Sequence, residues 1–129
     1  MEILSKIIIW IVLLGSLWAI IKYTKKIDAE FKEWSPKSNP YVWGYLMGIL
    51  YFMFGIAILC LFIHTFLNKE ADLIMLPISL IPVYINIAIG IKVINRSEKA
   101  FMIATVFTLN PIIWVINYFY MKNRYDDFH

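Results

Sequence analysis

Uncharged apolar stretches alternate with short charged segments along the whole chain, a pattern typical of a membrane protein with several helical spans. The longest stretch, residues 41–67, contains no Asp, Glu, Lys or Arg. A helix of that length measures about 40 Å, enough to cross the roughly 30 Å hydrocarbon core of a bilayer. The same pattern predicts three further spans, over residues 7–22, 73–94 and 101–121.

The first predicted span is short. The charge-free stretch between Lys6 and Lys22 falls below the ~20 residues of a full span unless both lysines extend toward the headgroups. A cleaved signal peptide is the alternative, with Ala19 at the cleavage site. Leu17 and Trp18 stand where signal peptidase prefers a small residue, and the helical pattern continues past Ala19. A retained span is therefore favoured.

Residues 22–35 combine an apolar stripe with a charged face. The stripe consists of Tyr23, Ile27, Phe31 and Trp34, whose spacing places them on one side of a helix. Lysines and acidic residues occupy the other side. We expect an amphipathic helix on the cytoplasmic membrane interface, either separate from the first span or continuous with it. A solvated helix that docks on a partner is the alternative.

The second span has a face with almost no side chains. At about 100° per residue, Gly44, Gly48 and Gly55 fall within about 40° of one another around the helix. Glycines on one face let another helix approach closely. The other helix belongs either to the same chain or to a second copy or partner protein. The second interpretation is slightly favoured, because the face continues for three turns in a small chain.

Prolines and amides coincide near the middle of the third and fourth predicted spans. If these spans run antiparallel, Asn86 and Asn110 lie at matching depth near the bilayer midplane and can hydrogen-bond to each other. The candidate midplane site also includes Pro82, Pro111, Tyr84 and Thr108. Freed backbone groups at that depth would suit a binding or permeation site. The alternative, which is favoured, is that the two asparagines only hold helices together.

Composition agrees with a bilayer environment. The chain is 61% hydrophobic and 16% charged, whereas soluble domains average about 45–50% and 25%. The predicted fold class is an all-α integral membrane protein, with four transmembrane helices and one interfacial helix in a single domain over residues 1–129.

The basic residues indicate an orientation. Eight lie in the first and third connections between spans and four lie on the other side. The positive-inside rule therefore predicts that both termini are outside the cell. Because the basic residues separate apolar runs, the net charge of +3 gives no footprint for a nucleic-acid partner.

Several classes of activity lack their residues. The acidic residues all lie outside the predicted hydrocarbon core, which argues against a proton-coupled pump, an intramembrane aspartyl protease and a small multidrug exporter. Cys60 is the single cysteine, so an internal disulfide and a cysteine metal cluster are excluded. His64 falls near the outer interface, and neither histidine has partners at metal-binding spacing. We expect no enzyme activity, no cofactor and no metal site.

The remaining expectation is an interaction protein of a cell membrane. It would act by helix packing in the bilayer, as a homo-oligomer or as a subunit or immunity-type partner of a membrane complex. A small oligomeric channel or transporter built around the candidate midplane site is the alternative. The excess of lysine over arginine and the abundant isoleucine and asparagine favour the cytoplasmic membrane of a bacterium.

Overall fold

The computed structural model describes residues 2–37, 40–68 and 75–128, and over these the chain is helical with no strand. The elements are α1 (Glu2–Trp34), α2 (Val42–Leu67), α3 (Met75–Ile94), α4 (Glu98–Phe107), α5 (Pro111–Asn123) and the short 3-10 helix η1 (Tyr125–Asp127). The prediction of an all-α fold is confirmed.

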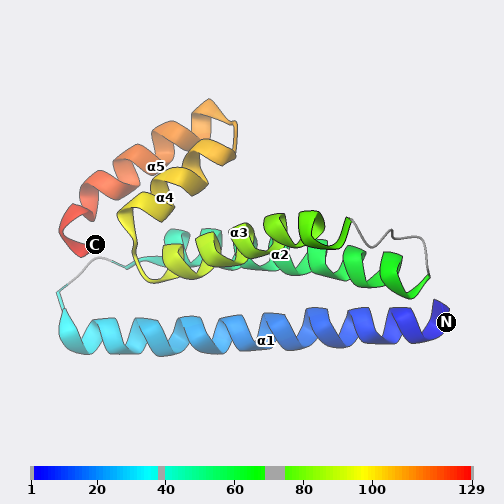
Figure 1. Cartoon of the computed structure of the whole chain (residues 1–129). Coiled ribbons are helices and arrows are strands. Elements are labelled where there is room, and N and C mark those ends of the chain that lie inside the picture. Colours follow the sequence, from blue (N-terminus) through cyan, green and yellow to red (C-terminus); the bar gives the residue numbers. More distant parts are fainter. Residues whose placement is uncertain (1, 38–39, 69–74, 129) are drawn as a thin grey trace.

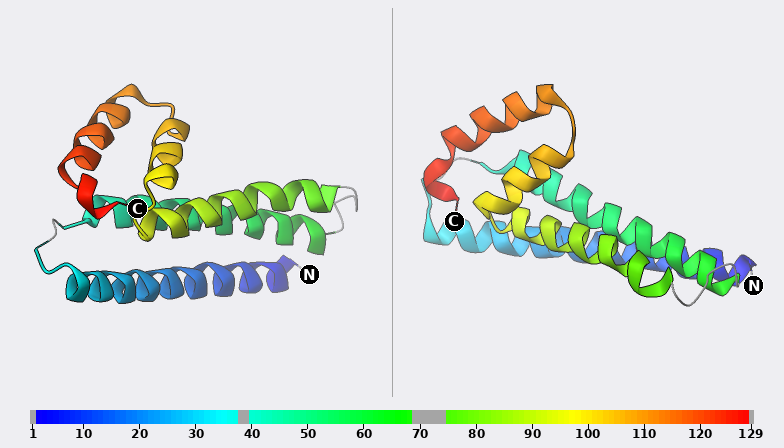
Figure 2. Two further views of the ribbon diagram at one scale, coloured as in Figure 1. Left: turned by 60° about the vertical axis from the view of Figure 1, so that its left-hand side comes forward. Right: turned by 45° about the horizontal axis from the view of Figure 1, so that its top comes forward.

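The three long helices lie side by side, and the two short ones form a hairpin that projects from them (Figure 1). α2 packs against both α1 and α3 and runs antiparallel to each of them. The α4–α5 hairpin rises from the end of this layer at which α1 ends and α2 begins, and the C-terminus returns to that end (Figure 2).

Two helices are long and apolar enough to cross a membrane, by length and composition. They are Ile3–Trp34 and Val42–Leu67, which correspond to the first and second predicted spans. α3 is 20 residues long, Met75–Ile94, and the side chains from Leu80 to Ile94, which the structure describes without a gap, form an apolar stretch. The start of the third predicted span, residues 73–74, lies outside the described residues. The structure thus contains two candidate spans, and it does not establish four.

The fourth predicted span, residues 101–121, is wrong as one continuous helix. α4 ends at Phe107 and α5 begins at Pro111. Leu109 between them has a φ of 52°, and the Asn110 side chain accepts a hydrogen bond from the Ile112 N–H at 3.0 Å. Asparagine at the N-cap followed by proline, which has no N–H to satisfy, starts a new helix rather than bending an old one. At about 15–20 Å, each half is too short to cross a bilayer.

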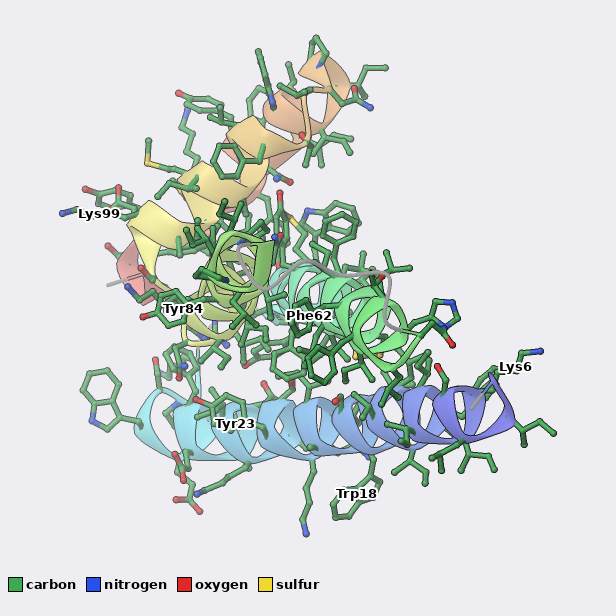
Figure 3. The ribbon with its side chains drawn as sticks, turned by 45° about the vertical axis from the view of Figure 1, so that its right-hand side comes forward. Lys6, Trp18, Tyr23, Phe62, Tyr84 and Lys99 are labelled. Carbon is green, nitrogen blue, oxygen red and sulfur yellow. The ribbon has the colours of Figure 1, made fainter. Side chains whose placement is uncertain are left out.

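The predicted interfacial helix is continuous with the first span, as the second half of α1. Its stripe faces the rest of the chain at the α3–α4 corner. The Tyr23 hydroxyl accepts a hydrogen bond from Asn95 Nδ2 at 2.8 Å, Ile27 and Phe31 are half-buried, and only Trp34 is largely exposed. Figure 3 shows Tyr23 on the side of α1 that faces the other helices and Trp18 pointing away from them.

The two ends of the described chain lie at opposite ends of the helical layer. Near the start of α1, Ser5 Oγ lies 3.1 Å from His64 Nδ1 near the end of α2. At the other end, Arg124 Nε donates to the Pro40 carbonyl at 2.7 Å. The prediction that both termini are outside the cell assumed a continuous fourth span, and the orientation of the termini in a membrane stays a prediction.

Candidate functional site

The predicted glycine face is occupied within the chain. Gly48 faces Gly90 of α3, Gly55 faces Ile87 of the same helix, and Gly44 is covered by the ring of Tyr41. All three glycines are buried. The interpretation of this face as intrachain packing therefore agrees with the structure, and the favoured one, a free face for a partner, does not.

The candidate midplane site does not form within one copy of the chain. Asn86 Nδ2 donates to the Pro82 carbonyl one turn earlier in α3 at 2.8 Å, whereas Asn110 caps α5. Thr108 Oγ1 donates to the Thr105 carbonyl at 2.6 Å. Each of these three side chains thus has a hydrogen-bond partner close to it in the sequence. The remaining members, Tyr84 and Pro111, are exposed and contribute nothing to a shared site.

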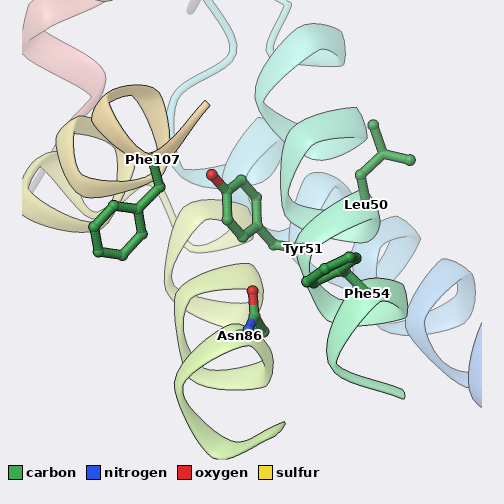
Figure 4. A pocket seen from close by; sticks show the side chains of 5 residues that line it. All are labelled: Leu50, Tyr51, Phe54, Asn86 and Phe107. Atoms are coloured by element: carbon green, nitrogen blue, oxygen red, sulfur yellow. The ribbon is translucent and has the colours of Figure 1, made fainter. Parts of the chain in front are cut away.

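An apolar recess lies where part of that site was expected. It has a volume of about 410 Å³ and is lined by Leu50, Tyr51, Phe54, Asn86 and Phe107 (Figure 4). Two polar groups line this recess, the Tyr51 hydroxyl and the Asn86 amide. The hydroxyl already donates to the Ala104 carbonyl of α4, so the amide is the polar group that a ligand could contact. A recess with one amide in an apolar wall suits a hydrocarbon chain better than an ion.

The most unusual side chain lies at the corner between α3 and α4. Arg96 is 2% exposed and has a φ of 63°, a left-handed conformation in which glycine is usual. The Arg96 N–H donates to the Val93 carbonyl and the Ser97 N–H to the Lys92 carbonyl. These two bonds form a Schellman motif that ends α3. Ser97 then caps α4.

Aromatic rings and one hydroxyl hold the Arg96 guanidinium. Its Cζ lies 3.6 Å from the Phe31 ring centroid, 4.4 Å from that of Tyr41 and 5.5 Å from that of Tyr45. Its Nη2 donates to the Tyr45 hydroxyl at 3.0 Å, which donates to Asp28 Oδ1 at 3.0 Å. We call Asp28, Phe31, Tyr41, Tyr45 and Arg96 the arginine corner.

Two donor nitrogens of this guanidinium have no acceptor among the described residues. Arg96 Nε and Nη1 are buried and make no hydrogen bond with any described residue. The Asp28 carboxylate, which could have paired with Arg96, bonds to Tyr45 through one oxygen and to Lys32 Nζ through the other at 3.1 Å. An unmet donor on a buried charged group costs at least about 1–3 kcal/mol. The arginine corner therefore retains a positive charge that the described chain satisfies only in part.

The other helices converge on the arginine corner. The buried Tyr41 hydroxyl donates to the Val93 carbonyl at 2.8 Å, and its ring contacts those of Phe101, Tyr120 and Phe128. Arg124 lies over Tyr120, with Cζ 3.8 Å from the ring centroid. α1, α2, the hairpin and the C-terminal tail thus all contribute to one aromatic cluster.

A cavity of about 310 Å³ adjoins the arginine corner. It is lined by Asp28, Lys32, Pro36, Pro40, Tyr41, Val42, Tyr45 and Arg96. A second recess, on the Phe31 side of the same guanidinium, contains Glu30. The first cavity has two cationic side chains and one carboxylate in its wall, whereas the second has one of each. The first therefore has a net positive wall.

A buried amide attaches the hairpin to α2. Asn117 is almost fully buried, and its Oδ1 accepts a hydrogen bond from Trp43 Nε1 at 2.7 Å. Its Nδ2 donates to Thr105 Oγ1 at 2.8 Å and to Met47 Sδ at 3.4 Å. Every hydrogen-bonding group of this amide has a partner, so the network fixes α5 against α4 and α2 without leaving a free binding group.

Sequence reasoning did not single out Arg96 or Asn117. Arg96 counted only as a basic residue between two spans, because its burial depends on rings from α1 and α2 that are distant in sequence. The available signal was the rarity of arginine, which occurs twice in this lysine-rich chain. Asn117 offered a better one, as a lone amide within an apolar helix.

Comparison with protein-family models, with curated proteins and with solved structures gave no match. No group of three His, Cys, Asp or Glu side chains that could hold a metal ion occurs among the described residues. The arginine corner and the exposed hairpin are therefore interpreted from their own geometry.

Proposed function

We propose that this chain is a small non-enzymatic integral membrane protein that acts by packing its helices against another membrane protein. The other protein is either a second copy, which makes a homo-oligomer, or a membrane complex that this chain serves as a subunit or immunity-type partner. The location is a cell membrane, and the composition favours the cytoplasmic membrane of a bacterium.

The exposure of the two candidate spans, α1 and α2, supports a bilayer location. In their most apolar stretches, 11% of α1 and 28% of α2 is buried within the chain. The core helix of a soluble protein would be mostly buried. Large apolar side chains cover the outer faces, among them Trp10, Ile11, Leu14, Trp18, Leu50, Phe54, Leu61 and Phe66. Exposed apolar surface on this scale is covered by lipid or by other proteins.

Basic side chains support a definite orientation. Among the described residues, Lys6 lies near the end of the helical layer where α1 begins. The other basic residues lie toward the end that holds the arginine corner, namely Lys22, Lys25, Lys26, Lys32, Lys37, Lys92, Arg96, Lys99, Lys122 and Arg124. Figure 3 shows Lys6 and Lys99 at opposite ends. By the positive-inside rule the arginine corner and the C-terminal tail face the cytoplasm, and the N-terminal end of α1 faces outside. This replaces the expected arrangement with both termini outside.

The observation that carries the proposal is the exposed tip of the α4–α5 hairpin. Leu109 is 81% exposed, and Asn110 is exposed beside it. If the hairpin enters the bilayer, its non-helical tip must be covered by protein, because lipid offers no hydrogen bonds to the backbone. If it stands in water, its outer apolar side chains need a cover, namely Ile103, Val106, Phe107, Ile112, Val115, Ile116 and Phe119. Both placements require a partner.

A hairpin that lies flat on the headgroups is the remaining placement, and its composition does not suit it. Interfacial helices have a strongly charged face. From Ala100 to Met121 the hairpin contains no Asp, Glu, Lys or Arg. The apolar sequence therefore favours contact with another protein over a position at the membrane surface.

Site-specific photo-cross-linking in native membranes tests the proposal. A photoreactive residue at Leu109 or Ile112 should form a protein adduct, and the same residue at Leu14 or Trp18, on the lipid-facing side of α1, should not. An adduct of twice the mass of the chain identifies a second copy, and any other discrete mass identifies a partner. Absence of an adduct at the tip, or equal adducts at all four positions, would contradict the proposal.

Ion flux provides the test between this proposal and the channel alternative. Within one copy Asn86 and Asn110 do not meet, so a pore requires assembly of several chains. Purified protein in liposomes should give no flux of common ions. Flux that is lost in Asn86→Leu protein of unchanged fold would replace the interaction protein with a channel.

A further inference from the structure

The unsatisfied guanidinium of Arg96 points to a ligand. Arginine keeps its charge in proteins, and its planar fork of donors matches the oxygen atoms of phosphate and carboxylate groups. Here one nitrogen bonds to Tyr45 and two buried nitrogens have no acceptor among the described residues. Arg124, the other arginine of the chain, stacks on a tyrosine in the same way but donates to two carbonyl oxygens. The difference lies in the acceptors and not in the stacking.

Neither of the described acidic residues that line the two recesses beside Arg96 pairs with it. Both oxygens of Asp28 are engaged, by Tyr45 and by Lys32. Glu30 lines the recess on the opposite side of Arg96, and no ion pair joins it to Arg96 among the described residues. The cavity that adjoins Arg96 and Lys32 is about 310 Å³, which leaves room for a small polyatomic anion and for part of the group attached to it.

We propose that this cavity binds a phosphate oxyanion between Arg96 and Lys32. The phosphate belongs either to the headgroup of an acidic phospholipid or to a soluble phosphate compound. Basic pockets between helices at the cytoplasmic end of a membrane protein are typical sites for anionic headgroups. Lysine-rich surroundings at that end of the chain raise the local concentration of either source.

Binding would involve a local rearrangement. Arg96 Nε and Nη1 are covered in the chain alone, so the wall of the cavity must move for an anion to reach them. The Lys32 side chain is 69% exposed, and it can leave Asp28 and turn toward the anion. The Tyr45 hydroxyl, which now accepts from Arg96 and donates to Asp28, can donate to a phosphate oxygen instead.

Thermal unfolding of the full chain in detergent micelles tests the proposal. The probes are phosphatidylglycerol with phosphatidylcholine as the neutral comparison, and inorganic phosphate with chloride at equal ionic strength. We expect phosphatidylglycerol or phosphate to raise the Tm of the wild-type protein, because a ligand of the folded state stabilises it. A rise with phosphatidylglycerol alone identifies a lipid headgroup, and a rise with inorganic phosphate identifies a soluble source. No rise with either probe would overturn the proposal.

Variants locate the site. Arg96→Gln should lower the apparent affinity about tenfold or more, whereas Lys99→Gln, the control, should keep the Tm rise because Lys99 is exposed and lines neither recess beside Arg96. Equal loss in both variants would mean that only general charge matters and would overturn the proposal. If Arg96→Gln does not fold, Val42→Trp fills the rim of the cavity at an exposed position and leaves Arg96 in place. An undiminished Tm rise in that variant would refute a site in this cavity. These outcomes do not depend on whether the hairpin tip has a partner.

Discussion

Gly48 of α2 and Gly90 of α3 lie against each other where the two helices cross. A methyl group built on Gly48 would lie 2.8 Å from the Gly90 carbonyl oxygen, and one built on Gly90 would lie 2.6 Å from the Gly48 carbonyl oxygen. On Gly90 every close atom is backbone, whereas on Gly48 the methyl group would also meet the Ile94 side chain at 2.5 Å. The backbone atoms cannot move aside as a flexible side chain can. This contact lets the two backbones approach closely, as small residues do between membrane helices.

Gly48→Ala should therefore destabilise the protein by about 1–3 kcal/mol, because the added methyl group forces the helices apart. Gly15→Ala is the matched control, since nothing lies within 4 Å of a methyl group at that position. The control should be neutral or slightly stabilising, because alanine favours a helix over glycine. Reversible unfolding in mixed micelles of increasing denaturing detergent measures both. Equal effects of the two substitutions would show that helix propensity, and not the crossing, decides stability.

The glycine spacing predicted the face but not the neighbour. Periodicity places Gly48 and Gly55 on one side of α2, yet several apolar helices could lie against it, and the sequence does not choose among them. α3 follows α2 directly in the sequence, which makes it one of the helices that can pack against this face. Gly44 differs again, since the ring of Tyr41 covers it, a local contact that no helical pattern reveals.

Two further residues explain why the sequence predicts one continuous fourth span where the structure has two helices. Asn110 and Pro111 have the sequence of a helix start, but charge-free residues continue on both sides of them. Hydropathy measures the solvent that a segment prefers and is insensitive to a change of chain direction. A turn at the left-handed Leu109 leaves the apolar run unbroken and still reverses the chain. Local capping chemistry was the better guide at this position.

Asn86 and Asn110 should act independently. Asn110→Ala removes the cap of α5 and should cost about 1 kcal/mol, whereas Asn110→Ser keeps an N-cap oxygen and should cost less. Because Asn86 bonds within its own helix, the double substitution should equal the sum of the single ones within about 0.5 kcal/mol. A coupling energy above about 1 kcal/mol would indicate that the two amides meet after all, for instance across two copies of the chain.

The Asn117 network should be sensitive to loss of one partner and tolerant of loss of both. Asn117→Leu leaves the N–H of the partly buried Trp43 without its acceptor and should cost about 1–3 kcal/mol. Adding Trp43→Phe removes the stranded donor, so the double variant should cost less than the sum of the two single ones. Unfolding free energies of the three variants measure this difference. A fully additive double variant would show that the hydrogen bond contributes nothing.

The arginine corner could not be predicted from the sequence, for a different reason. Its rings come from positions 31, 41 and 45 and its charge from position 96, so the site exists only after α1, α2 and α3 have packed. A loop arginine is usually solvated, and no local pattern distinguishes this one. The Tyr23, Ile27 and Phe31 stripe did indicate a face with a neighbour, but the neighbour is the chain itself and not the membrane surface.

The hairpin makes the orientation of the C-terminal tail testable. Arg124 bonds to Pro40, so the tail and the α1–α2 connection lie at the same end of the helical layer, whereas Leu4 lies at the other end. Single cysteines at Lys37, Tyr125 and Leu4, all exposed, would be introduced into Cys60→Ala protein and treated in intact cells with a membrane-impermeant thiol reagent. Opening the cells afterwards shows that each cysteine can react.

We expect the cysteines at positions 37 and 125 to be protected in intact cells and the one at position 4 to be labelled, because the basic residues gather at the end that holds the first two. The comparison between positions 37 and 125 is the decisive one. A continuous fourth span would place them on opposite sides of the membrane, so labelling of 125 with protection of 37 would restore that arrangement. Equal protection requires the chain to turn back between α4 and α5, which is the geometry that Leu109 and the Asn110 cap produce.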